Sequence, residues 1–306
     1  MAAEAPLAIV GPTASGKTEV GIAVAHALDA EIVSVDSMLL YRGMDVGTAK
    51  PTAEDRAFVP HHLIDVAEPS EPFSVARYQR LALEAVRGVR ERGHRVLLVG
   101  GSGLYFRAVV DELGFPGTDA TTRAALEAEA EAVGAVALHA RLTDLDPVAA
   151  GRIQPENVRR TVRALEVAAV TGRPFSSFAR AWARFPPEHV RAAGIEIERP
   201  VLAERIRRRV DAMLERGLLD EVASLVRNGF GAWLTASQAI GYAEFARHLA
   251  GEMTLTQAVE GTVRRTKELA RRQMVWFRRD PRIRWFPAGY EGAGALADRL
   301  VGYLHG

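Results

Sequence analysis

The feature that most constrains this chain is a complete phosphate-binding loop close to its start. Residues 11–18 match the pattern G-x-x-x-x-G-K-[ST] and comprise Gly11, Pro12, Thr13, Ala14, Ser15, Gly16, Lys17 and Thr18. A short apolar run at residues 7–10 precedes the loop, and an apolar helical pattern at residues 18–28 follows it. This context predicts a buried strand, a phosphate-binding turn and a helix whose N-terminus faces the phosphate.

The residue types of the loop predict how it binds its ligand. Its glycines let backbone N–H groups converge on phosphate oxygens. The ammonium group of Lys17 adds positive charge, and the hydroxyl of Thr18 is placed to coordinate Mg²⁺. We therefore predict a phosphate site with magnesium as cofactor, and the loop alone is compatible with ATP or with another diphosphate.

The first third of the chain alternates between predicted strands and helices. Apolar runs at residues 31–35 and 95–99 predict two further strands, and residues 72–92 predict a long helix. This alternation is typical of a parallel sheet that binds ligands at the carboxyl ends of its strands. We therefore predict an α/β fold, with a parallel sheet core like that of P-loop NTPases flanked by helices.

From about residue 117 the pattern changes to alanine-rich helices. Helices are predicted at residues 122–142, 146–170, 202–227 and 256–279, and strands at residues 194–198 and 282–286. We interpret residues 1–117 and 187–306 as the catalytic core and residues 118–186 as an all-helical insertion.

Two polar side chains are expected at the edge of the sheet that carries the loop. Asp36 follows the strand at residues 31–35 and could accept a proton from a nucleophile. A helix cap or a magnesium ligand is the alternative role for Asp36. Ser102 follows the strand at residues 95–99, among glycines that would let a ligand approach the backbone. Its hydroxyl could bind a phosphate oxygen, or the segment could be a plain turn into a helix.

Composition narrows the class of protein without deciding its function. The 306 residues include no cysteine, which excludes disulfides and cysteine-ligated zinc. The net charge is only +1, yet arginines cluster within residues 152–163, 205–209 and 264–279. Such clusters fit a polyanionic partner, and they also fit solvated helix faces. No secretory signal or membrane-spanning stretch is visible, so we expect a cytoplasmic protein that contacts no membrane.

Further motifs in a fixed order make the pattern much more specific. After the loop come Asp36-Ser37, Tyr41–Asp45, Gly47–Pro51, His61–Asp65, Val99–Tyr105, Asn157–Val167, Arg205-Ile206, Arg209–Asp211, Gly241-Tyr242, Thr266-Lys267 and Leu269–Gln273. Together these motifs cover nearly the whole chain. They resemble the bacterial tRNA dimethylallyltransferases, which are also called tRNA isopentenyltransferases.

The resemblance implies a reaction and a role for each candidate residue. The family transfers a dimethylallyl group from dimethylallyl diphosphate to N6 of the adenosine on the 3′ side of the anticodon, in tRNAs that read codons beginning with U. The loop would hold the diphosphate, and Lys17, Thr18, magnesium and Arg209 would stabilise its charge as it leaves. Asp36 would orient the adenine amine and accept its proton. Ser102 stands where most relatives have threonine.

The resemblance also implies a surface for tRNA, since the target base must be extracted from the anticodon loop. The residues expected to contact tRNA are Asp36, Ser37, Met38, Leu39, Ser102, Arg123, Arg159, Arg160, Arg163, Gln238, Gly241 and Tyr242. The arginines at 159, 160 and 163 lie in the predicted insertion and would hold the anticodon stem-loop. We expect the enzyme to act as a monomer.

Three alternative functions share parts of this pattern. A P-loop kinase of a small metabolite shares the loop and the βαβ start, but it leaves the arginine-rich helices and the insertion unexplained. An adenylate isopentenyltransferase uses the same prenyl donor with a free nucleotide, and should need neither feature. A non-catalytic RNA-binding switch would bind nucleotide without transfer, and the retention of Asp36, Lys17, Thr18 and the hydroxyl of Ser102 argues against it.

Overall fold

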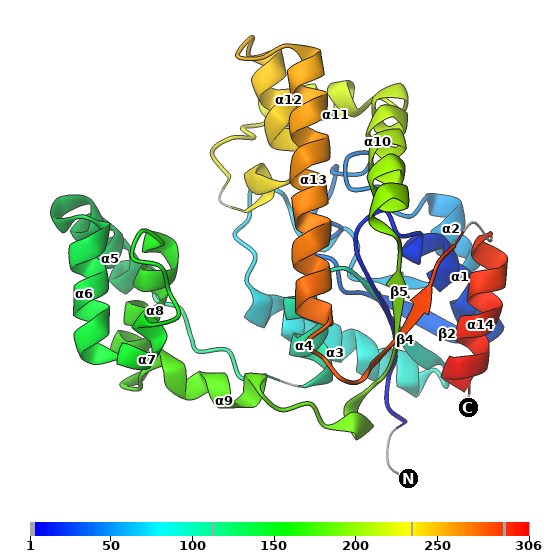
Figure 1. Ribbon diagram of the computed structural model, residues 1–306, viewed down its shortest axis with the longest axis horizontal. Coiled ribbons are helices and arrows are strands. Elements are labelled where there is room, and N and C mark those ends of the chain that lie inside the picture. The colour runs from blue at the N-terminus through cyan, green and yellow to red at the C-terminus, as the bar shows by residue number, and fades with distance from the viewer. Residues whose placement is uncertain (1–3, 112, 234, 290–291, 306) are drawn as a thin grey trace. The chain divides into compact units, whose positions relative to one another are not determined.

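The chain folds into two compact units. The computed structural model describes residues 4–111, 113–233, 235–289 and 292–305 (Figure 1). Met1–Glu112 and Pro186–Gly306 form one unit, which we call the core unit, and Leu113–Phe185 form the other, which we call the helical unit. The helical unit is therefore inserted into the core unit along the chain. Within the described ranges, no helix is both long and apolar enough to span a membrane.

A single sheet of six parallel strands forms the centre of the core unit, in the order β3-β2-β4-β1-β5-β6. The strands are β1 (Leu7–Val10), β2 (Ala30–Ser34), β3 (His61–His62), β4 (Arg95–Gly100), β5 (Arg191–Glu196) and β6 (Ile283–Pro287). β1 lies between β4 and β5, with Ile9 paired to Val99 and to Ala193. The predicted α/β class with a parallel sheet is confirmed.

Helices cover both faces of this sheet (Figure 1). They are α1 (Lys17–Ala27), α2 (Ala53–Phe58), α3 (Val75–Glu91), α4 (Gly103–Val110), α10 (Arg199–Glu215), α11 (Leu218–Arg227), α12 (Tyr242–Leu249), α13 (Leu255–Phe277) and α14 (Ala293–His305), with short 3₁₀ turns at Pro187–His189 and Ala236–Gln238. Leu7 and Ile9 of β1 pack with α1 and α14, whereas Ala8 and Val10 pack with α3, α4 and α13. Because successive side chains of a strand point to opposite faces, a continuous apolar run suits a strand covered on both sides.

Three predicted helices are wrong in length because each contains a break. The helix predicted at 202–227 ends after α10, and Gly217, with φ 91°, starts α11. Gly134, with φ 85°, divides the helix predicted at 122–142. The one predicted at 146–170 is divided by residues 151–157. A positive φ suits glycine and ends a helix, although the apolar pattern continues on both sides.

The helical unit has an apolar core of its own. Its elements are α5 (Ala120–Val133), α6 (Ala135–Leu145), α7 (Pro147–Ala150), α8 (Val158–Thr171), a 3₁₀ turn at Phe175–Phe178 and α9 (Ala179–Trp182). Leu126, Leu138 and Leu142 are buried together there. The fully buried carboxylate of Glu166 accepts hydrogen bonds from the guanidinium groups of Arg123 (2.9 Å) and Arg163 (2.8 Å). A buried charge needs such partners, so these two arginines stabilise the unit itself.

Candidate active site

The phosphate-binding loop connects β1 to α1, as its sequence predicts. Gly16 has φ 87° and precedes the first residue of α1, Lys17, and no side chain caps the helix. The backbone N–H groups of Gly16, Lys17 and Thr18 find no protein acceptor in the part of the chain that the structure describes. Unpaired N–H groups at a helix N-terminus, together with the helix dipole, bind anions.

The ammonium group of Lys17 lies inside this loop. It donates hydrogen bonds to the carbonyl oxygen of Pro12 (2.5 Å) and, at 3.5 Å, to the hydroxyl of Ser15. Burial and, to a smaller extent, the charge of Arg209 lower the pKa of Lys17 to about 7, although the Asp36 carboxylate opposes both effects. Near neutral pH the Lys17 side chain is therefore only partly protonated, and a bound phosphate would favour its charged form.

Asp36 lies just beyond the carboxyl end of β2, as predicted. Its Oδ1 accepts a hydrogen bond from the backbone N–H of Met38 at 2.9 Å, which holds the carboxylate in place and leaves Oδ2 for another partner. Its negative charge acts on both Lys17 and Arg209, so the three groups lie close enough to interact. This arrangement can accept a proton beside a bound anion.

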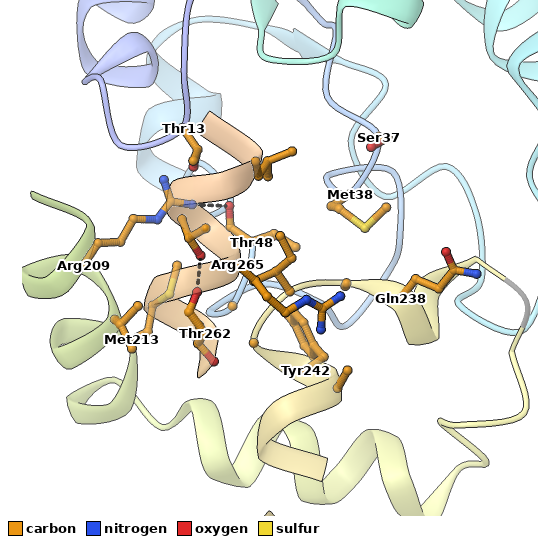
Figure 2. Close-up of a pocket in the computed structure, with 18 of the residues that line it drawn as sticks. Thr13, Ser37, Met38, Thr48, Arg209, Met213, Gln238, Tyr242, Thr262 and Arg265 are labelled. Carbon is orange, nitrogen blue, oxygen red and sulfur yellow. Dashed lines mark hydrogen bonds between the residues drawn. The ribbon is translucent and has the colours of Figure 1, made fainter. Parts of the chain in front are cut away.

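Arg209 reaches the same place from α10. One of its terminal nitrogens donates a hydrogen bond to the carbonyl oxygen of Thr48 at 3.1 Å (Figure 2). Burial lowers the pKa of the Arg209 guanidinium, and the charge of Asp36 opposes that effect. Arg205, one helical turn earlier, also lines the loop cavity, but its guanidinium donates a hydrogen bond to the carbonyl oxygen of Gly289 at 3.5 Å. Arg209 is therefore the arginine that lies beside Asp36.

Two cavities meet at these residues. The loop cavity, of about 350 Å³, is lined by residues 13–19 of the phosphate-binding loop and by apolar side chains such as Leu39. The larger cavity, of about 600 Å³, lies among α10, α12 and α13. Both are lined by Thr13, Asp36, Thr48, Arg209 and Gln273. A ligand in the loop cavity would therefore be next to a ligand in the larger cavity.

The larger cavity contains several residues predicted to contact tRNA. In Figure 2, Thr13, Thr48 and Arg209 lie toward one side of this cavity, and Ser37, Met38 and Gln238 lie toward the other. Gly241 and Tyr242 also line it, at the start of α12. These predicted residues come from segments far apart in the chain, and folding brings them to one cavity.

A loop at residues 45–50 holds Thr48 in position, and sequence reasoning missed the residue that supports it. The carboxylate of Glu221, on α11, accepts hydrogen bonds from the backbone N–H groups of Asp45 (2.9 Å), Val46 (2.8 Å) and Gly47 (3.1 Å). The hydroxyl of Tyr242 donates to the same carboxylate at 2.6 Å. Glu221 lies over 170 residues further along the chain, and no local motif marks it.

The glycines around Ser102 make room for the protein itself. A Cβ on Gly101 would overlap the side-chain nitrogen of Gln273, and a Cβ on Gly103 would overlap the ring of Trp276. Both partners lie on α13, so these glycines admit a helix where we expected a ligand to approach. The Ser102 hydroxyl caps α4 by accepting from the N–H of Tyr105 at 3.4 Å.

Ser102 lies near Asp36 without lining either cavity. Its backbone N–H donates to the carbonyl oxygen of Val35 at 3.0 Å, which places it next to the end of β2. Among the residues that the structure describes, Ser102 is absent from the lining of both cavities. These contacts show the turn into a helix that was the alternative for this segment, and a contact of the Ser102 hydroxyl with a ligand stays a prediction.

The arginines predicted to contact tRNA fall into two groups. Arg123 and Arg163 are bonded to Glu166 inside the helical unit. Arg159 and Arg160 are exposed at the start of α8, and their side chains form no ion pair with any residue in the described ranges. Only the second pair therefore presents unpaired positive charge.

The residues present fit a metal ion that is bound together with a phosphate ligand. In the described part of the chain, no three or more histidine, aspartate or glutamate side chains are grouped to hold a metal. The exposed Thr18 in the first turn of α1 and the carboxylate of Asp36 line the same cavity. Mg²⁺ commonly binds through one or two such groups, substrate phosphates and water.

The fold and the site together define a P-loop α/β protein with a second cavity beside its phosphate site. A family model described as IPP transferase matches residues 39–280. Over 301 residues the chain is 51% identical to the tRNA dimethylallyltransferase of Salinispora arenicola, covering 98% of this chain and 86% of that one. The corresponding protein of Thermobifida fusca is 52% identical over 291 residues, covering 92% and 89%. The chain belongs to the IPP transferase family.

Solved structures agree with this family. The full-length tRNA isopentenylpyrophosphate transferase of Bacillus halodurans is 41% identical, with a TM-score of 0.70 over 99% of this chain and 97% of that one. A eukaryotic dimethylallyltransferase acting on tRNA shares the fold at 24% identity, with a TM-score of 0.79 over 94% of this chain and 75% of that one.

Proposed function

We propose that this protein transfers a dimethylallyl group from dimethylallyl diphosphate to N6 of the adenosine on the 3′ side of the anticodon, in tRNAs that read codons beginning with U. One observation carries the proposal: Asp36 and Arg209 line both the loop cavity and the larger cavity. A group could therefore pass from a diphosphate in one to a nucleophile in the other. The relatives named tRNA dimethylallyltransferase support this choice of substrates.

The diphosphate would lie at the N-terminus of α1. The unpaired N–H groups of Gly16, Lys17 and Thr18 would donate to its oxygens, and Lys17 and Arg209 would add positive charge. When bound, magnesium supplies further positive charge to the leaving group, held by Thr18 and the diphosphate oxygens. These groups stabilise the charge that grows as the bond between the allyl carbon and oxygen breaks.

Asp36 would act on the acceptor. The N6 atom forms a bond to the first allyl carbon as that carbon separates from the diphosphate oxygen. N6 then carries an excess proton, which the Asp36 carboxylate accepts. The hydrogen bond from Met38 N–H holds Oδ1, so Oδ2 is the atom that would face the amine.

The larger cavity would receive the extracted adenine. Flipping a base costs stacking energy, which contacts to the base and its neighbours must offset. Ser37, Met38, Gln238, Gly241 and Tyr242 line this cavity and are the residues we assign to those contacts. Leu39 lines the loop cavity instead, and Ser102 lies beside Asp36.

The helical unit would hold the anticodon stem-loop. Arg159 and Arg160 supply exposed positive charge on α8, as phosphate binding requires. Arg123 and Arg163 would support them through the buried Glu166, with any direct contact to RNA a further prediction. We propose that the enzyme does this as a cytoplasmic monomer.

The test is transfer of radiolabelled dimethylallyl from its diphosphate, with magnesium, to unmodified tRNA or to free AMP. Label on tRNA alone is the expected result. Label on AMP alone would assign an adenylate isopentenyltransferase. Label on neither acceptor, with ATP bound tightly, would favour a kinase or a nucleotide-dependent switch.

A further inference from the structure

One side chain from α13 reaches into the phosphate-binding loop. The Oε1 atom of Gln273 accepts a hydrogen bond from the backbone N–H of Thr13 at 2.8 Å, although 260 residues separate the two in sequence. Its Nε2 atom lies against Gly101, which has no Cβ to obstruct it. The amide group is therefore hydrogen-bonded through its oxygen and packed against Gly101 at its nitrogen.

This contact divides the loop's backbone donors into two sets. Thr13 N–H is bonded to Gln273, Ser15 N–H donates to Pro12 O at 3.3 Å, and Pro12 has no N–H. In contrast, the N–H groups of Gly16, Lys17 and Thr18 have no acceptor among the described residues. Donors remain at the helix end of the loop, whereas the donors of Thr13 and Ser15 are already paired.

Such loops bind a row of phosphates with backbone N–H groups, while the lysine reaches the outer phosphates. A ligand with one more phosphate needs donors further from the helix, toward Thr13, where Gln273 already accepts. Gln273 also lines both cavities, so it lies where the loop cavity opens to the larger one. Displacing it would leave a polar group without a partner, which is unfavourable.

We propose that Gln273 restricts this loop to ligands with two phosphates and rejects those with three. The inference rests on the proposed function, since it explains how a loop with an ATP-binding motif selects a prenyl diphosphate. Gln273 acts as a specificity-determining residue. Gln273 discriminates between the two ligands because its side chain occupies the space that a third phosphate would need. It also takes up the backbone N–H of Thr13, which would otherwise bind that phosphate.

The experiment compares binding of inorganic diphosphate and inorganic triphosphate, each with magnesium, by isothermal titration calorimetry. Inorganic ligands isolate phosphate number from any contact to a nucleoside or a prenyl group. The variants are Gln273→Ala, which frees Thr13 N–H, and Gln273→Glu, which keeps an acceptor and adds negative charge. Glu268→Gln, an exposed position on the same helix, is the matched control.

The wild-type protein and the control should bind diphosphate at least about tenfold more tightly than triphosphate, as the loss of one hydrogen bond implies. Gln273→Ala should reduce this ratio about tenfold, and Gln273→Glu should increase it. If Gln273→Ala does not fold, Gln273→Ser is measured in its place, with the same expectation. An unchanged ratio in the folded variant, or a wild-type protein without preference, would overturn the inference.

The result is independent of the transfer reaction. Transfer to tRNA with an unchanged ratio would contradict the role of Gln273 and leave the proposed function intact. A reduced ratio in Gln273→Ala, in a protein that transfers nothing to tRNA, would support the role of Gln273 and contradict the proposed function.

Discussion

Lys17 combines a partly buried position with its proposed phosphate-binding role, so the protonation of its side chain depends on the surrounding site. Burial and Arg209 lower its pKa to about 7 despite the opposing charge of Asp36. In an ordinary exposed position the ammonium would stay protonated far above neutral pH. The free protein therefore contains a lysine that is only partly charged under physiological conditions.

This pKa predicts how diphosphate binding depends on pH. The charged form of Lys17 binds the anion, so affinity is greatest below pH 7 and falls as pH rises through the pKa of about 7. We expect inorganic diphosphate to bind about tenfold more weakly for each pH unit above 7, relative to a Lys17→Arg variant that stays charged. Titrations of both proteins from pH 6 to 9 test this. Parallel pH profiles for the two proteins would contradict it.

The residues of the site differ in how far sequence alone could identify them. The loop, Asp36 and Ser102 follow strands directly, so their placement at one edge of the sheet was predictable. Glu221 acts across more than 170 residues of chain and Gln273 across 260, and only folding shows their partners. The Ser102 hydroxyl caps α4 and the neighbouring glycines admit α13, which the sequence left open, while a contact of this hydroxyl with a ligand stays a prediction.

At the scale of elements, α11 supports the reactive site through the loop at residues 45–50. The carboxylate of Glu221 accepts from three successive backbone N–H groups, and that loop presents the Thr48 carbonyl to Arg209. Glu221 has no direct access to a ligand in the loop cavity, whose lining in the described residues does not include it. It is therefore a positioning residue for Arg209.

Glu221→Ala should lower kcat for transfer about tenfold and change KM for tRNA much less, because we propose that Arg209 acts mainly on the departing diphosphate. It should also destabilise the fold by about 2 kcal/mol, since several donors lose a charged acceptor. Glu221→Gln, which keeps one acceptor oxygen, should recover part of both. Steady-state kinetics and urea unfolding measure the effects.

A matched control is Glu252→Ala, whose partner Arg247 is exposed. Full kcat in Glu221→Ala would exclude the positioning role.

The helix α8 presents one arginine face to solvent and another to the interior of its unit. Arg160→Ala should weaken tRNA binding about threefold to tenfold and make it less dependent on salt, while donor affinity stays the same. Filter binding at several salt concentrations measures both quantities. Arg141→Ala, at an exposed position of α6 in the same unit, is the control. Loss of binding in the control but not in Arg160→Ala would place the RNA on another face.

The element pattern shows what sequence periodicity can resolve. Buried strands are short apolar runs, and the sheet was predictable from them. Helix breaks at Gly134 and Gly217 were not, because the amphipathic pattern continues across each glycine. Because isolated glycines are tolerated inside helices, only tertiary packing determines which glycines end a helix.

At the scale of the whole molecule, one buried cluster of charged side chains connects the two parts of the core unit that precede and follow the inserted segment. Arg282, beside β6, forms ion pairs with Asp111 (2.7 Å) and Asp280 (2.7 Å), and Asp111 also pairs with Arg107 of α4. Arg282 also donates to the carbonyl oxygen of Pro186 at 3.4 Å. Asp111 and Pro186 are close to the two ends of the inserted segment.

Arg282→Ala should lower the free energy of unfolding by about 3–5 kcal/mol, since it leaves two buried carboxylates short of a partner. Urea unfolding followed by circular dichroism measures this. Arg278→Ala, whose partner Glu196 is exposed, should cost less than about 1 kcal/mol. Equal effects in the two variants would mean that the buried cluster contributes no more than a surface ion pair.

The central claim is that the prenyl group crosses from the loop cavity to the larger cavity beside Asp36. The most direct test is the rate of dimethylallyl transfer to saturating tRNA by the wild-type protein and by Asp36→Asn, with the binding of tRNA and of inorganic diphosphate measured for each. We predict a rate lower by about a hundredfold or more in the variant, with both ligands still bound at saturating concentration, because an amide cannot accept the proton. An undiminished rate in Asp36→Asn would contradict the account.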